Sequence, residues 1–189
     1  MTKDEAFTHQ EIFTTKRLRL RPLKMADAEG FFGIKSDPEV TIPYGQDPHL
    51  SLAETEAWVQ RCIVGYERYQ SIAWALTLKD EDIVIGFCCY WHFDPNFICG
   101  EIGFELGKPY WRKGIMSEAL LPVIGYGFRE LELHRIEACP LASNTASRNL
   151  LLKLSFSYEG NLRQRDLFRG RFEDQAYYGL LKGEWPASV

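Results

Sequence analysis

The sequence predicts a single domain of α/β (α+β) class, with a mixed, mostly antiparallel twisted sheet of about seven strands flanked by about four helices. The length of 189 residues suits one hydrophobic core. Segments with the two-residue hydrophobic period of strands alternate with segments of helical period. Short polar turns join several strand segments, as they do between antiparallel neighbours. We therefore expect strands and helices to share one core.

Each element is predicted from its hydrophobic period and from the residues that interrupt it. Alternating basic and apolar residues indicate the first strand. Asp37 and Pro38 end the first helix, and Ser51 with Glu54 three residues later forms a capping box at the start of the second. The expected order is strand 16–23, helices 25–35 and 51–69, strands 72–78, 83–93 and 100–106, helix 115–131, strand 134–139, helix 144–154, and strands 158–168 and 172–181.

Two of these elements matter most for function. In the helix over residues 115–131, apolar residues recur at spacings of three and four, while Pro122 removes a backbone donor and predicts a kink. The strand over residues 100–106 has one apolar and one polar face. Its alternation places Ile102, Phe104 and Leu106 on one face and Glu101, Gly103 and Glu105 on the other.

The composition argues against nucleic-acid binding, membrane insertion and metal binding. A net charge of −4 lacks the basic excess of a nucleic-acid surface and favours a cationic substrate. The N-terminus is polar, and no apolar run approaches the roughly 18 residues of a membrane span. We therefore expect a cytoplasmic protein, with residues 1–15 disordered or peripheral. Five scattered cysteines without metal-site spacing predict reduced thiols and no metal site.

The segment KPYWRKGIM leads from the strand over residues 100–106 into the next helix. The first N–H groups of a helix have no partner inside it and carry the positive end of its dipole, so they bind phosphate groups. Gly114 has no Cβ and lets the backbone approach an anion, and Arg112 and Lys113 add positive charge. A solvated turn with one glycine explains the same residues. The absence of a Walker loop and of a dinucleotide fingerprint disfavours nucleotide hydrolysis.

With its surroundings, this segment resembles the GNAT acetyltransferase superfamily, and within it the RimJ/RimL-like branch that acetylates protein N-termini, including those of ribosomal proteins. The resemblance rests on TKRLRLRPLKMADAEGFF near the start, EIGFELGKPYWRKGIMSEAL in the middle, and then LHRIEA and NTASRNLLLKLSFSYEG. It implies one GNAT-like domain over residues 1–189, a monomer or homodimer, whose sheet splays where acetyl-CoA binds as co-substrate.

The resemblance also implies which residues lie beside the cofactor. The family's pyrophosphate loop, [QR]xxGx[GA], resembles residues 111–116, with Gly114 as the central glycine and departures at Trp111 and Met116. Main-chain donors do most of the holding in such a loop, so we expect coenzyme A binding to persist. The strand before the loop would pair with the pantetheine arm. The expected cofactor residues are Phe104, Glu105, Leu106, Trp111, Arg112, Lys113, Gly114, Ile115, Met116, Ser117, Asn144 and Ser147.

Acetyl transfer to an amine requires a neutral amine, and an α-amino group has a pKa of about 8, so a base or a water relay is needed. The resemblance points to Asp166, which stands where RimL-like enzymes have a glutamate. Glu101 is an independent candidate on the polar face of its strand, and either residue could instead be a solvated carboxylate. By the resemblance, Ser147 would protonate the leaving thiolate with Asn144 nearby, although Asn144 also suits a plain helix N-cap.

The acceptor implied by the resemblance is the N-terminal amine of a protein, such as a ribosomal protein. One alternative is a small amine, namely a polyamine, an aminoglycoside or an amino acid. Another is a coenzyme A-binding module without turnover, because the chain departs from the family at Trp111, Met116, Ser155 and Asp166. Aromatic residues are commonly part of the core, but four could contact the acceptor. These are Tyr44, Trp58, Trp91 and Phe93.

Overall fold

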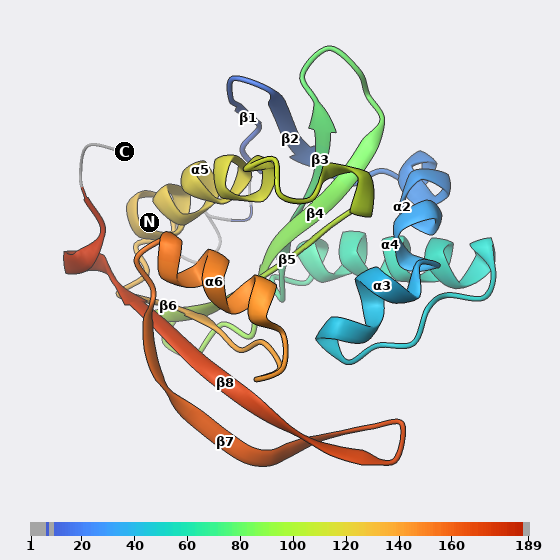
Figure 1. Cartoon of the computed structure of the whole chain (residues 1–189). Coiled ribbons are helices and arrows are strands. Elements are labelled where there is room, and N and C mark those ends of the chain that lie inside the picture. The colour runs from blue at the N-terminus through green and yellow to red at the C-terminus, as the bar shows by residue number, and fades with distance from the viewer. Residues whose placement is uncertain (1–6, 8–9, 187–189) are drawn as a thin grey trace.

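One sheet of eight strands runs through the structure, a computed structural model that describes residue 7 and residues 10–186 (Figure 1). Within these residues the strand order is β1-β2-β3-β4-β5-β6-β8-β7. β5 and β6 pair in parallel, and all other neighbours are antiparallel. The predicted mixed, mostly antiparallel sheet is confirmed. The strands are β1 (Phe13–Thr14), β2 (Leu18–Pro22), β3 (Ile72–Leu78), β4 (Val84–Trp91), β5 (Cys99–Leu106), β6 (Arg135–Ala138), β7 (Ser157–Phe168) and β8 (Arg171–Leu181).

Helices cover both faces of this sheet. The larger buried cluster lies between the strands and α5, and the smaller one lies between the strands and α2 and α4 (Figure 1). The α-helices are α2 (Ala28–Lys35), α3 (Pro38–Thr41), α4 (Leu52–Glu67), α5 (Ile115–Arg129) and α6 (Thr145–Lys153). The 3₁₀ helices are η1 (Met25–Asp27), η2 (Ile42–Tyr44), η3 (Lys108–Tyr110) and η4 (Lys182–Glu184).

Two short elements, β1 and α3, lie outside the predicted set. The Asp37 carboxylate accepts a hydrogen bond from the Glu39 N–H at 2.9 Å, and Pro38 occupies the first turn of α3. Asp37 and Pro38 therefore end α2, as predicted, and also begin a new helix, because proline is well suited to the first helical turn. β1 is two residues long and is defined by its pairing with β2.

The described part of the N-terminal segment is packed rather than peripheral. Phe7 is buried and packs against Tyr66 and Tyr69. The Gln10 amide donates to the Ala73 carbonyl at 2.6 Å, which fastens the segment to β3. The expectation that residues 1–15 are disordered or peripheral is therefore wrong for these residues, and residues 1–6 and 8–9 lie outside the described part of the chain.

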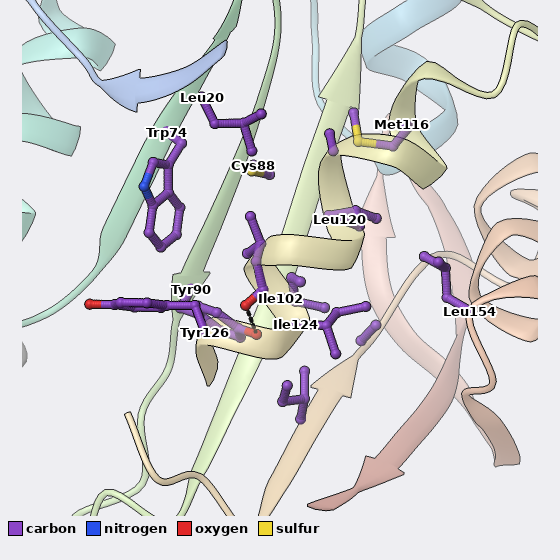
Figure 2. Packing of buried hydrophobic residues seen from close by; sticks show 14 of the residues in the cluster. Leu20, Trp74, Cys88, Tyr90, Ile102, Met116, Leu120, Ile124, Tyr126 and Leu154 are labelled. Carbon is purple, nitrogen blue, oxygen red and sulfur yellow. Dashed lines mark hydrogen bonds between the residues drawn. The ribbon is translucent and has the colours of Figure 1, made fainter. Parts of the chain in front are cut away.

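The α5 face holds the main core (Figure 2). Leu120 and Ile124 of α5 are fully buried against strand residues, and the Tyr90 hydroxyl donates to the Val123 carbonyl at 3.0 Å. A Cβ on Gly127 would lie 2.4 Å from that hydroxyl, so only glycine fits there. This contact explains a glycine inside a helix that, with Pro122 in its middle, runs unbroken to Arg129.

The sheet opens between β5 and β6. Their parallel pairing covers only Cys99–Glu101 opposite Arg135–Glu137, although β5 continues to Leu106. The Gly107 N–H donates to the Ile85 carbonyl on the β4 side at 2.9 Å. Because successive residues of a strand direct their main-chain groups to opposite sides, Phe104 and Leu106 direct theirs into the gap that β6 leaves. The predicted splay is present.

Candidate active site

Two cavities meet at the end of β5. The first, the loop cavity, has a volume of about 780 Å³ and lies among α3, β5, residues 110–117 and α6. The second, the sheet cavity, has a volume of about 480 Å³ and lies between the α4 face of the sheet and the β7–β8 hairpin. Residues that line both cavities form their junction. They are Tyr44, Phe104, Glu105, Asn144 and Ser147.

The loop cavity contains a set of unpaired main-chain donors. Within the described residues, the N–H groups of residues 112–117 donate no hydrogen bond to another part of the chain. Arg112 and Gly114 both have left-handed backbone conformations, with φ values of 59° and 71°. These conformations turn successive N–H groups toward one side at the start of α5, which is the arrangement that binds an anion. The loop can therefore hold a diphosphate through its backbone.

A clamp of three side chains holds this loop in shape. Glu118, in the first turn of α5, accepts hydrogen bonds from the Thr15 hydroxyl at 2.6 Å and from the Arg17 Nε at 2.7 Å. Arg17 also donates from Nη1 to the Lys113 carbonyl at 2.9 Å. Because that carbonyl is turned toward Arg17, the neighbouring N–H groups are left free. The sequence analysis missed this clamp, since its partners lie 96 to 103 residues apart.

Ser147 and Asn144 lie at the junction because of the way α6 begins. The Asn144 side-chain oxygen accepts a hydrogen bond from the Ser147 N–H at 3.1 Å, so Asn144 is the N-cap of α6. The cap fixes the first turn of α6 and places Ser147 on the wall that both cavities share. A hydroxyl in this position is within reach of groups that enter from either side.

The two candidate carboxylates, Glu101 and Asp166, line the sheet cavity and not the loop cavity. They come from different elements, β5 and the β7–β8 hairpin. Glu101 lies 2.9 Å from Nδ1 of His92, a residue with a left-handed φ of 46°. Its side chain is 19% exposed, whereas that of His92 is 78% exposed. Glu101 thus has one imidazole partner at the mouth of the cavity.

Asp166 reaches the cavity because β7 bulges immediately before it. Leu162 pairs with Gln175 and Asp166 with Glu173, so residues 163–165 stand opposite Asp174 alone. The Asp174 carboxylate accepts a hydrogen bond from the Gln164 N–H at 2.8 Å. Bulges of this kind redirect the side chains that follow them.

A buried ion pair forms part of the junction and was also missed. The Lys35 Nζ lies 2.9 Å from Oε1 of Glu105 and 3.0 Å from Oε2, and each side chain is only 5% exposed. The Tyr44 hydroxyl donates to Glu105 at 2.9 Å, and the Lys35 Nζ lies 4.0 Å from the centre of the Trp58 ring. Burial, with the adjacent charge of Glu105, raises the pKa of Tyr44 well above its usual value, so the phenol remains a donor.

The remaining predicted contacts divide between the cavities and the core. Trp91 lines the sheet cavity. Phe93 lines neither cavity and packs against Phe97 and Tyr90, so it belongs to an aromatic cluster rather than to the acceptor site. Lys113 lines neither cavity, and its ammonium lies 6.0 Å from the centre of the Tyr110 ring.

The described cysteines are free thiols. Burial raises the pKa of Cys62, in the sheet cavity, to about 12, and raises that of Cys139 to about 12 as well. Both thiols are therefore protonated at neutral pH.

No group of three or more His, Cys, Asp or Glu side chains in the described residues could hold a metal ion. In the same part of the chain, no helix has the length and apolar character needed to cross a membrane.

Comparison with known proteins identifies the family. The model of the acetyltransferase (GNAT) domain matches residues 17–157, which is most of the chain. The chain belongs to the GNAT acetyltransferase superfamily. It is 37% identical to the uncharacterized N-acetyltransferase p20 of Bacillus licheniformis over 175 residues, covering 93% of this chain and 98% of that protein. The crystal structure of a GNAT-family acetyltransferase from Bacillus anthracis superposes with a TM-score of 0.83 at 25% identity, covering 92% of this chain and all of that one.

The GNAT relatives also include an enzyme with a known acceptor. The [ribosomal protein uS5]-alanine N-acetyltransferase of Escherichia coli is 33% identical over 111 residues, covering 56% of this chain and 55% of that protein. The predicted GNAT membership and the predicted acyltransferase activity are confirmed. GNAT enzymes use acetyl-CoA, and the loop cavity, with its free N–H groups and basic Arg112, fits the diphosphate of that donor.

Proposed function

We propose that this chain acetylates the N-terminal α-amino group of a protein, such as a ribosomal protein, with acetyl-CoA as donor. The observation that supports this proposal is the junction of the two cavities. Free main-chain N–H groups line the loop cavity, and carboxylates line the sheet cavity. The donor and the amine would therefore enter from different sides and meet at Ser147, without a covalent enzyme intermediate. The relationship to the E. coli uS5-alanine enzyme supports the choice of a protein N-terminus.

Each group of residues would have a distinct role. The N–H groups of residues 112–117 would bind the diphosphate, and the main chain of Phe104 with the N–H of Leu106 would align the pantetheine arm in the gap beside β5. Bound acetyl-CoA supplies an activated acyl thioester. Glu101 or Asp166, directly or through water, would accept the proton that the acceptor's ammonium group must lose before the neutral amine attacks the thioester. As the C–S bond breaks, the Ser147 hydroxyl would protonate the departing thiolate and regain a proton from the nitrogen of the tetrahedral intermediate, which leaves the amide and a free thiol.

The first experiment tests the donor site. Gly114→Asp forces a side chain into a left-handed conformation, and its Cβ would lie 3.7 Å from Nη2 of Arg17, so it disturbs both the loop backbone and the clamp that shapes it. We expect acetyl-CoA affinity, measured by calorimetry, to fall at least about tenfold. The same substitution at exposed Gly183, which has nothing within 4 Å of its Cβ position, is the control and should bind as the wild type does. Unchanged binding by Gly114→Asp would contradict the assignment.

The second experiment tests the base and the acceptor. In an assay of free-thiol release with N-terminal peptides, Glu101→Gln and Asp166→Asn are compared at saturating acetyl-CoA. Loss of a general base lowers kcat by about 10² to 10⁴, so the variant that falls into this range identifies the base. Thiol release with small amines but with none of the peptides would reject a protein N-terminus as the acceptor. Binding of acetyl-CoA without turnover of any acceptor would instead support the alternative of a coenzyme A-binding module without catalytic activity.

A further inference from the structure

The sheet cavity extends past Glu101 into a hollow between the sheet and α4. Ala73, Cys89 and Gly103 stand opposite one another on β3, β4 and β5, so three small residues occupy one level of the sheet. All three line the sheet cavity. The Trp91 ring lies over Gly103, with a ring carbon 3.2 Å from the position of a Cβ there, so the space that the small residues leave under α4 lies beside this ring and has it as a wall. We call this space the inner compartment, and it is lined by Trp58, Cys62, Ala73, Phe87 and Cys89.

The inner compartment is apolar and uncharged. The Trp58 and Phe87 rings form one side, with centroids 5.0 Å apart at 67°. Burial raises the pKa of Cys62 to about 12 and that of Cys89 well above its usual value, so both thiols are neutral. Charge occurs only at the ends of the compartment. The Lys35–Glu105 pair at one end neutralises itself, and Glu101 lies at the other.

The distance from Glu101 to the compartment matches one side chain. Glu101, Gly103 and Glu105 alternate along β5 and so face the same side of the sheet. With a rise of about 3.3 Å per residue, the compartment begins about 7 Å along the strand from Glu101. This is the reach of a leucine, methionine or phenylalanine side chain from an α-amino group held at the carboxylate. Alanine and serine are too short to enter.

We propose that the acceptor carries a bulky apolar group next to its amine, and that N-termini beginning with leucine, methionine or phenylalanine are preferred over those beginning with alanine or serine. This inference rests on the proposed N-acetyltransferase function and specifies its substrate class. Burial of a large apolar side chain in a complementary pocket changes kcat/KM by about 10-fold to 200-fold. The carboxylates at the mouth hold the amine, and the compartment selects the group beside it.

The test compares two peptides that differ only in their first residue, phenylalanine or alanine, by kcat/KM for thiol release. We expect the wild type to prefer phenylalanine by at least about tenfold. Cys62→Phe adds bulk from α4 and should reduce that ratio to about one while activity on the alanine peptide persists, which also shows that the variant folds. Ala73→Val fills the same space from β3 and should lower the ratio in the same direction.

Two controls isolate the effect. Cys62→Ser keeps the size of the side chain and should retain most of the preference. Cys99→Phe adds the same bulk at a half-buried cysteine of β5 that lines neither cavity, and should leave the ratio unchanged. 2-Phenylethylamine and ethylamine form a second pair that probes the compartment without a peptide.

The outcomes separate this inference from the function on which it rests. Equal rates within each pair, or a preference for alanine, would overturn the inference while thiol release from either peptide still supports the proposed function. A higher kcat/KM for 2-phenylethylamine than for ethylamine, with neither peptide acetylated, would support the selective role of the inner compartment. It would also reject the protein N-terminus as the acceptor. The absence of thiol release with every acceptor would reject both.

Discussion

Replacing Lys35 with methionine tests how strongly the buried ion pair depends on both of its charges. The two side chains are each 5% exposed, with the ammonium 2.9 Å from one oxygen of Glu105. Methionine has a similar length and no charge, so the Glu105 carboxylate would remain buried with the Tyr44 hydroxyl as its partner. Removal of one member of a buried pair costs about 3–5 kcal/mol. We expect the free energy of unfolding to fall by that amount.

The assay is urea unfolding at pH 7 followed by far-UV circular dichroism, because Trp58 lies over Lys35 and its fluorescence would respond to the substitution directly. The double variant Lys35→Met/Glu105→Gln removes both charges and should regain most of the loss. Lys108→Met is the matched control, since Lys108 pairs with Glu39 at the surface, where such pairs contribute about 0–1 kcal/mol. A Lys35→Met variant within about 1 kcal/mol of the wild type, or a double variant as unstable as the single one, would refute the reasoning.

Three further predictions concern the loop, the first turn of α5 and the end of α6. Arg17→Ala releases the Lys113 carbonyl, so calorimetry should show acetyl-CoA affinity reduced about 2-fold to 12-fold. Arg19→Ala, at an exposed arginine, is the control and should leave the affinity unchanged. Equal effects of the two substitutions would contradict a role for the clamp. Burial alone would raise the pKa of Glu118, but hydrogen bonds from Thr15 and Arg17 outweigh it and lower the pKa. The stabilisation is therefore present above about pH 4.5 and lost as pH falls through the lowered pKa, so the free energies of urea unfolding of wild type and Glu118→Gln should converge as the pH is lowered below 4.5. Ser155 has a φ of 68°, a left-handed conformation that glycine adopts without strain. Ser155→Gly should therefore raise the free energy of unfolding, measured in urea, by about 0.5–1 kcal/mol. A lower free energy of unfolding would show that the serine side chain makes a contact that outweighs the strain.

The fold could be predicted wherever an element spans several hydrophobic periods. β3 has the predicted bounds, and α5 contains its predicted buried face. β1 and α3 are each shorter than five residues, which is too short for a period to show. Their existence is decided by tertiary contacts, such as the pairing of Phe13 with Leu20. For the same reason the sequence showed Asp37 and Pro38 as the end of one helix but not as the start of another.

The site could be predicted where its chemistry is local to the backbone. Free N–H groups at the start of a helix depend on a few consecutive residues, so the loop around Gly114 was visible in the sequence. The partners of Glu118 and of Lys35 were not, because they depend on how strands far apart in the chain come together. Lys35 did carry one signal, since it follows Phe31 by four residues and so lies on the buried face of α2. A charge on such a face requires a buried partner.

The departures from the family's loop pattern change side chains and leave the main-chain donors intact. The Trp111 indole N–H donates to the Leu106 carbonyl at 2.6 Å, so the tryptophan ties the loop to the end of β5 instead of presenting a polar side chain. Met116 is 7% exposed and packs into the core beneath α5 (Figure 2). Neither residue occupies the N–H groups of residues 112–117. Asp166 differs in kind, because a carboxylate shortened by one methylene changes where a proton can be accepted. It follows that donor binding should be preserved in this chain, and that any divergence in activity should arise on the acceptor side of the junction.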